Sequence, residues 1–381
     1  MSHVYFDHNA TTPVDDAVLE AMLPYLRDQH GNASSRHEFG TRARQAVEAA
    51  REQVAALLNV QPVQVIFTSG GTEANNLFVK GAAAYLKPAQ IAISAIEHSC
   101  VVKPAQELTR QAWTLRRVAV DGRGQVDLAD LDEALKVPTG IVSVMLANNE
   151  TGVIQDVALA GERARRAGAL MHTDAVQAVG KIPVDFAALQ VHALTLSAHK
   201  FYGPKGAGAL VIDKRIELRP QLGGGGHERG LRSGTENVPA IVGFGAAAEL
   251  AASRLATLAP RLAALQQRLE QGLTALGAVV FGAGATRLPN TTFFALRGMD
   301  GEALLIELDK VGFAVASGAA CSSANPEPSA TLTAMGVERE IGLGAVRFSL
   351  GKSNTAEQVD DFLRALATVA QRLRKLKAMT V

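Results

Sequence analysis

Two residues near the middle of the chain have types and settings that suit carbonyl chemistry. Lys200 follows the apolar run ALTLS in SAHKFYGPKG, so we expect it at the end of a strand, partly shielded from water. Such shielding lowers the pKa of a lysine from about 10.4 and favours the neutral amine that forms Schiff bases. Asp174, in HTDAVQ, ends another apolar run and could stay ionised there. Taken alone, Lys200 could be an ordinary solvated lysine and Asp174 a helix N-cap.

A glycine-rich turn adds a candidate anion site. The segment SGGTEANN spans residues 69–76, and its glycines let the backbone approach a ligand closely. The next residues open a helix whose unpaired N–H groups and positive dipole end suit a phosphate, although Thr72 could simply cap that helix. The segment lacks the Gly-Lys-Ser/Thr ending of a P-loop. A lysine, a carboxylate and a phosphate site together meet the needs of pyridoxal 5′-phosphate, for its aldehyde, ring nitrogen and phosphate.

One histidine and two cysteines are further candidates for chemistry. His98, in EHSC, follows a third apolar run and could lie over such a ring as an acid or base, or could be structural. Cys100 is expected to be a small buried hydrophobe. Cys321 lies in SGAACSSANPEPS, residues 317–329, among small and helix-breaking residues. We expect a movable loop there, on which the thiol is either a nucleophile or inert.

Alternating strand and helix patterns would position these residues. From about Val63, short β-branched runs alternate with helical patterns, which predicts a mostly parallel sheet with helices on both faces. The predicted strands are VQVIF, QIAISAI, TLRRVAV, IVSVMLA, ALMHTDA, HALTLSA and GALVID. Ligands bind outside the carboxyl ends of such strands. We therefore expect one polar rim made of GGTEANN, EHS, NNET, DAVQ and AHKFYGPKG.

The second part of the chain predicts a smaller domain. A helical segment from about Val238 to Leu276 is expected to link it to the first domain. Beyond that segment, a helix through Leu308 and a final amphipathic helix from about Thr355 accompany the apolar runs AVVFG, NTTFFALR, FAVASG and AVRFSLG. This mixture is typical of an α+β domain.

Composition excludes several classes of protein. The 381 residues are 48% hydrophobic and 20% charged, as in a globular protein, with a net charge of +1. The basic run RLRKLK near the C-terminus is most simply a solvated helix face, so we expect no nucleic-acid partner. With neither a signal peptide nor an apolar run of about 18 residues, we expect a cytoplasmic protein without a membrane partner. Two cysteines cannot form a disulfide framework, and no His and Cys spacing suggests a metal site.

Taken together, the motifs closely resemble those of the cysteine desulfurases of the NifS/IscS type, class-V relatives of the aminotransferases with the PLP-dependent type I fold. The resemblance covers nearly the whole chain in family order. The matching segments are YFDHNATTP, GNASSRHEFG, FTSGGTEANN, EHSCVV, NNETGVIQD, HTDAVQAVGK, SAHKFYGPKG, GGGGHERGLRSGTENV, SGAACSSANPEPS and VRFSLG. The resemblance implies an α/β fold whose large domain, residues 14–250, has a mostly parallel seven-stranded sheet. Residues 1–13 and 251–381 would form the small domain, with the cysteine loop at about 317–330.

The resemblance also implies roles for single residues. Lys200 would hold the cofactor, Asp174 would pair with its ring nitrogen, and His98 would stack on the ring as an acid or base. Further cofactor contacts would be Gln177 and Asn149 at the ring hydroxyl and Gly71, Thr72, Ser197 and His199 at the phosphate, with Thr235 reaching across from the second subunit of a homodimer. Arg347 would pair with the substrate carboxylate, near Asn32, Asn149 and His37. From the residues alone, Arg347 could equally form a surface ion pair.

The implied reaction converts L-cysteine to L-alanine. Free cysteine would displace Lys200 from the cofactor, Lys200 and His98 would transfer protons, and the Cys321 thiolate would attack the substrate sulfur. The persulfide left on Cys321 would pass to an acceptor protein, such as a scaffold for Fe–S cluster assembly. The alternatives are a selenocysteine lyase or aminotransferase of the same fold, in which Cys321 is incidental, and a nucleotide-binding or sulfur-carrier module without a covalent cofactor.

Overall fold

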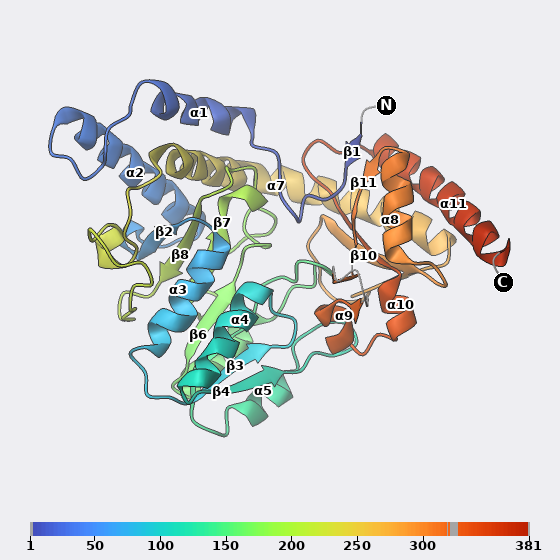
Figure 1. The fold of residues 1–381 in the computed structure, drawn as a ribbon, viewed down its shortest axis with the longest axis horizontal. Coiled ribbons are helices and arrows are strands. Elements are labelled where there is room, and N and C mark those ends of the chain that lie inside the picture. Colours follow the sequence, from blue (N-terminus) through green and yellow to red (C-terminus); the bar gives the residue numbers. More distant parts are fainter. Residues whose placement is uncertain (1–2, 318, 321–326, 380–381) are drawn as a thin grey trace.

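A seven-stranded sheet forms the centre of the larger part of the molecule (Figure 1). The structure, a computed structural model, describes residues 3–317, 319–320 and 327–379. The strand order is β2-β8-β7-β6-β5-β3-β4. Their bounds are β2 (Val65–Thr68), β3 (Gln90–Ser94), β4 (Thr114–Val118), β5 (Thr139–Ser143), β6 (Leu170–Asp174), β7 (Ala193–Ser197) and β8 (Gly208–Ile212).

The sheet is parallel except at β8, which pairs antiparallel with both β2 and β7. Only residues 198–207 connect β7 to β8. A parallel crossover needs about a dozen or more residues, so this connection can return the chain only as an antiparallel neighbour. The mostly parallel sheet expected from the sequence is confirmed.

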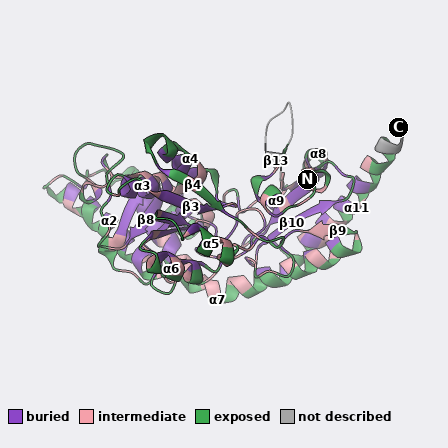
Figure 2. Ribbon diagram, turned by 90° about the horizontal axis from the view of Figure 1, so that it is seen from below, coloured by how far each residue is buried: buried purple, intermediate pink, exposed green. Residues whose placement is uncertain are grey.

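Helices cover both faces of this sheet, as the continuously apolar runs of most of its strands predict. The edge strand β4, TLRRV, departs from this pattern and is largely exposed. Alternate strand residues point to opposite faces: Ile91 belongs to one buried cluster and Ala92 to the other. The cluster that contains Ile91 is covered by α3 (Gly71–Ala83) and α4 (Ser99–Leu108). The opposite cluster is covered by α2 (Glu38–Leu57), α5 (Leu128–Ala134), α6 (Val157–Arg166) and the start of α7 (Val238–Ala275), with α1 (Asp16–Arg27) packed against α7. Figure 2 shows the buried strands between exposed helix faces.

The long helix α7 joins two hydrophobic cores. Phe244 lies in the core of the large sheet, whereas Leu269 and Leu273 lie in a second core near the C-terminus. Figure 1 shows α7 passing from one part of the molecule to the other. By length and composition α7 could cross a membrane. Its buried residues lie within both protein cores, however, which is the arrangement of a core helix. The predicted helix at about 238–276 is confirmed.

The second core lies on one face of a four-stranded antiparallel sheet in the order β12-β15-β10-β9, and a smaller cluster that contains Phe293 lies on the other face. Its strands are β9 (Ala278–Val280), β10 (Thr291–Leu296), β12 (Ala316–Ser317) and β15 (Ala345–Ser349). The helices of this region are α8 (Gly301–Lys310), α9 (Ala330–Ala334), α10 (Arg339–Leu343) and α11 (Ala356–Met379). The short pair β13 (Ala319–Ala320) and β14 (Glu327–Pro328) flanks residues 321–326. Cys321 therefore lies outside the described residues.

The N-terminal segment belongs to this second region and then crosses to the first. Strand β1 (Val4–Tyr5) pairs with β11 (Phe313–Ala314), and Phe6 stacks on Phe348 with ring centroids 4.0 Å apart. Farther along, the Thr12 N–H donates to the carbonyl oxygen of His199 over 2.9 Å. Residues 7–12 thus run between the two sheets and reach the carboxyl end of β7.

Candidate functional site

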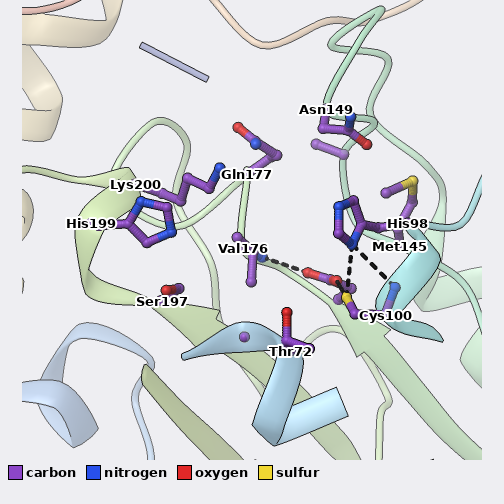
Figure 3. Close-up of a pocket in the computed structure, with 13 residues that line it drawn as sticks. Thr72, His98, Cys100, Met145, Asn149, Val176, Gln177, Ser197, His199 and Lys200 are labelled. Atoms are coloured by element: carbon purple, nitrogen blue, oxygen red, sulfur yellow. Dashed lines mark hydrogen bonds between the residues drawn. The ribbon is translucent and has the colours of Figure 1, made fainter. Parts of the chain in front are cut away.

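One pocket lies at the carboxyl ends of five strands of the large sheet (Figure 3). Each predicted polar segment after β2, β3, β5, β6 and β7 contributes to its lining. The lining residues are Gly71, Thr72, His98, Cys100, Met145, Ala147, Asn149, Asp174, Val176, Gln177, Ser197, His199 and Lys200. The structure thus confirms that the five polar segments meet at one edge of the sheet, as expected from the sequence.

Lys200 ends a short 3-10 turn (Ala198–Lys200) that directly follows β7. Its Nζ donates hydrogen bonds to the carbonyl oxygens of Asn9, over 2.7 Å, and Ala10, over 2.8 Å. Burial, followed by the positive charge of Arg347, lowers the pKa of Lys200 to about 8. A substantial share of the ε-amine is therefore neutral near physiological pH, as nucleophilic addition to a carbonyl requires.

Asp174 is buried at the end of β6, and both of its carboxylate oxygens are bonded. Oδ1 accepts from the Val176 N–H over 3.0 Å, and Oδ2 accepts from the Asn75 side-chain amide over 2.7 Å. The Val176 bond closes a turn, and no helix begins between β6 and β7, a stretch that the structure describes in full, so the helix N-cap considered from the sequence is wrong. The same carboxylate also lines the pocket, so its role in the turn is compatible with a functional one.

The first turn of α3 lines the opposite part of the pocket, with Gly71 and Thr72 at its start. Ala74 donates the first backbone bond of this helix, to Gly70, so the preceding N–H groups face outward from the helix end. A Cβ at Gly71 would lie 2.8 Å from Cγ2 of Val176, so only glycine lets the helix end approach the turn after β6 this closely. Ser197 and His199 line the pocket together with this turn.

His199 is held in its neutral form. Its Nδ1 lies 3.1 Å from Oγ1 of Thr11. Burial, followed by the charges of Lys200 and Lys205, lowers the pKa of His199 to about 4. A neutral imidazole keeps one N–H to donate and one nitrogen to accept, so His199 can donate to an anion only through the nitrogen that carries the proton.

A hydrogen-bonded group centred on Asn9 holds Lys200 and Gln177 of the pocket. The carbonyl oxygen of Asn9 accepts from Lys200 and, over 3.0 Å, from Nε2 of Gln177. Its side-chain oxygen accepts from Nζ of Lys181 over 2.9 Å, and Lys181 also donates to Oε1 of Gln177 over 2.7 Å. Sequence reasoning missed Asn9 and Lys181. Their motifs, YFDHNATTP and HTDAVQAVGK, hold no local signal that gives either residue a role.

Arg347 lies on β15 of the small sheet and contacts the rim without lining the pocket. Its Nη1 donates to the carbonyl oxygen of Asn149 over 3.0 Å, and its Nη2 pairs with Asp7 over 2.7 Å. Its Nε is buried and has no hydrogen-bond partner among the described residues. The guanidinium is thus half-buried beside the site rather than part of an open surface ion pair.

His98 and Cys100 make an unexpected pair. His98 caps the N-terminus of α4, and its Nδ1 lies 2.8 Å from Sγ of Cys100. The expectation that Cys100 is buried is confirmed, but its thiol also lines the pocket. Burial, followed by the negative charge of Asp174, raises the pKa of Cys100 to about 12, so this thiol stays protonated.

Three predicted site residues lie elsewhere. Asn32 is exposed, and its side-chain oxygen accepts from the Ser34 N–H. Thr235 is exposed on the segment that precedes α7, and His37 caps α2 through its Nδ1. None of these residues lines the pocket of this single chain. Their roles, like that of Cys321, stay predictions.

Comparison with known proteins identifies the family. The sequence profile of the family described as Aminotransferase class-V matches residues 4–362. The chain belongs to that family. Among its class-V relatives, "Cysteine desulfurase 2" of Trichormus variabilis is 45% identical over 99% of this chain and 95% of its own length. "Cysteine desulfurase IscS" of Anaeromyxobacter sp. strain Fw109-5 is 46% identical over 99% of this chain and 94% of its own length.

A solved structure agrees with these relatives. The structure titled "NifS-like protein" has a TM-score of 0.92 and 40% identity, over 97% of this chain and 99% of its own. The predicted fold is therefore confirmed. The chain is a class-V enzyme of the cysteine desulfurase type, and its relatives favour this activity over the selenocysteine lyase and aminotransferase alternatives.

Proposed function

We propose that this chain is a pyridoxal 5′-phosphate enzyme that releases sulfur from L-cysteine, forms L-alanine and keeps the sulfur as a persulfide on Cys321. One observation carries the proposal: Lys200, Asp174 and the first turn of α3 converge on a single pocket. An amine of lowered pKa, a buried carboxylate and a helix N-terminus are the three groups that this cofactor needs.

The residues present fit the cofactor. Lys200 would bind its aldehyde covalently, and Asp174 would pair with its ring nitrogen. The first turn of α3 would hold the phosphate, since Gly71 leaves room there that a Cβ would fill. The remaining contacts would come from Thr72, Ser197 and His199 at the phosphate, Gln177 and Asn149 at the ring hydroxyl, and Thr235 of a second subunit. When bound, the cofactor withdraws electrons from the substrate and so stabilises negative charge beside the substrate nitrogen.

The chain's own groups divide the remaining work. With a pKa of about 8, Lys200 can both accept and return a proton near neutral pH. His98, which lines the pocket, would serve as a second acid or base. Arg347 would bind the substrate carboxylate, because its unpaired Nε and its fork suit a bidentate contact. Cys321 would attack the substrate sulfur and keep it.

The wider assignments are also proposals. We place the division between domains near residue 250, because the start of α7 packs in one core and its end in the other. A homodimer would bring Thr235 and Asn32 toward a neighbouring site. The sulfur would pass to an acceptor protein in the cytoplasm, such as an Fe–S scaffold, in keeping with the name of the IscS relative.

Mass spectrometry after brief exposure to L-cysteine tests the proposal directly. The peptide that contains Cys321 should gain one sulfur atom while L-alanine appears in equal amount. The matched control is Cys321→Ala, which should still bind the cofactor but accumulate no protein-bound sulfur. If Cys321→Ala releases sulfur from cysteine at the rate of the unaltered chain, the thiol is incidental and the proposal is wrong.

A further inference from the structure

We infer that Cys100 is a positioning residue for His98: its thiol, held by Asn75, donates a hydrogen bond to Nδ1 and directs the protonated Nε2 of the ring toward the reactants. The inference deepens the proposed function, since it assigns a cause to the orientation of the proposed acid or base. The contact itself can be measured without substrate.

The two contacts at Nδ1 define its protonation. The backbone N–H of Cys100 donates to Nδ1 over 3.3 Å, and Sγ lies 2.8 Å from the same atom. A backbone N–H can only donate, so Nδ1 must act as the acceptor and carry no proton. In the neutral ring the proton is then on Nε2. Figure 3 shows both contacts converging on one side of the ring.

Asn75 determines which way the thiol points. This residue is fully buried, and its Nδ2 donates to Sγ of Cys100 over 3.0 Å and to Oδ2 of Asp174 over 2.7 Å. The opposite amide orientation would place an oxygen against the Asp174 carboxylate, which is repulsive, so the amide orientation is determined by Asp174. Because Sγ already accepts from Asn75, its single hydrogen is available for donation.

The thiol has two possible acceptors, and distance decides between them. Oδ2 of Asp174 lies 3.9 Å from Sγ, whereas Nδ1 of His98 lies 2.8 Å away. The S–H therefore donates to His98. A chain of hydrogen bonds then connects Asp174, Asn75, Cys100 and His98. Asp174, proposed to pair with the cofactor's ring nitrogen, and His98, proposed to lie above the cofactor ring, are thereby held by one chain of hydrogen bonds.

The consequence is a histidine whose Nε2–H is aimed at the pocket as a hydrogen-bond donor. His98 is exposed, and beyond Cys100 its side chain has no hydrogen-bond partner among the described residues. Without the thiol of Cys100, the His98 ring keeps only the 3.3 Å contact with the backbone N–H of residue 100. Rotation of the His98 side chain would then reduce the time that Nε2 spends toward the reactants. Serine retains a hydroxyl donor at this position, whereas alanine retains none.

Infrared spectroscopy of the S–H stretching band tests the contact. The chain has two cysteines, so the full-length Cys321→Ala protein carries a single thiol, that of Cys100. Its band, measured as purified and without substrate, should lie at the lower frequency of a hydrogen-bonded thiol. Adding His98→Phe should move the band. A band at the frequency of an unbonded thiol, or one that His98→Phe leaves in place, would overturn the inference.

Kinetics of single variants at position 100 provide the second test. Loss of one neutral hydrogen bond predicts a fall in kcat of about three- to tenfold for Cys100→Ala, with little change in KM. Cys100→Ser should restore most of the loss, which a purely packing role for the thiol would not predict. Equal kcat values for the two variants would contradict the inference. Since the infrared band needs neither substrate nor Cys321, a failure of the proposed function would leave that measurement intact.

Discussion

The lowered pKa of Lys200 leads to a quantitative prediction about Arg347. With a pKa of about 8, roughly one fifth of the Lys200 amine is neutral at pH 7.4, against about one part in a thousand for an ordinary lysine, since each pKa unit is a factor of ten. Burial is the largest cause of this shift, and the charge of Arg347 is the next. Replacement by glutamine, which can still donate to the carbonyl oxygen of Asn149, should therefore raise the pKa of Lys200.

Competitive labelling measures that pKa directly. The protein, freed of cofactor, is treated with a trace of an amine-reactive anhydride over a range of pH, and labelling of the Lys200 peptide is followed by mass spectrometry. The midpoint should lie near pH 8 in the unaltered chain and higher in Arg347→Gln. A matched control is Arg287→Gln, because Arg287 is similarly buried but pairs with Glu270 and does not act on Lys200. An ordinary midpoint in the unaltered chain, or identical midpoints in Arg347→Gln and the control, would refute the reasoning.

Three further changes test the framework of the site. Glu228→Ala should lower the free energy of unfolding by about 3–5 kcal/mol in urea titrations, because buried Arg51 then keeps only one carboxylate, the exposed one of Glu48, and the Phe67 N–H loses its acceptor. A loss below about 1 kcal/mol would contradict this. Gly71→Ala should weaken uptake of pyridoxal phosphate by about tenfold through overpacking against Val176, and adding Val176→Ala should recover part of the loss. Burial lowers the pKa of Lys181 well below its usual value of about 10.5. The unfolded chain therefore binds more protons than the folded chain below that pH, and the free energy of unfolding should rise with pH up to about 10.5. Lys181→Met should reduce this rise by up to about 1.4 kcal/mol per pH unit. Equal slopes of unfolding free energy against pH in Lys181→Met and the unaltered chain would show that folding does not lower the pKa of Lys181.

Much of the large sheet and its rim can be predicted from the sequence because the signals are local. Each apolar run forms a strand within a few residues of its expected bounds, as β3 and β7 do. Parallel strands bring their carboxyl ends to one edge, so polar residues that follow five strands must meet there. The reversal of β8 is also local in origin, since it follows from the length of residues 198–207. The length of this connection alone, without any side-chain pattern, is enough to make β8 antiparallel to β7.

The contacts that complete the site are of a different kind, because they join residues far apart in the sequence. Asn9 bonds Lys200 only because β1 pairs with β11 and directs the N-terminal segment between the two sheets. No local pattern in YFDHNATTP predicts that route. Cys100 shows a second limit: small size and an apolar neighbourhood correctly predict burial, but its hydrogen bonds depend on Asn75, which α3 places beside α4. Residue type therefore predicts which groups can react, whereas the tertiary packing determines which hydrogen bonds orient them.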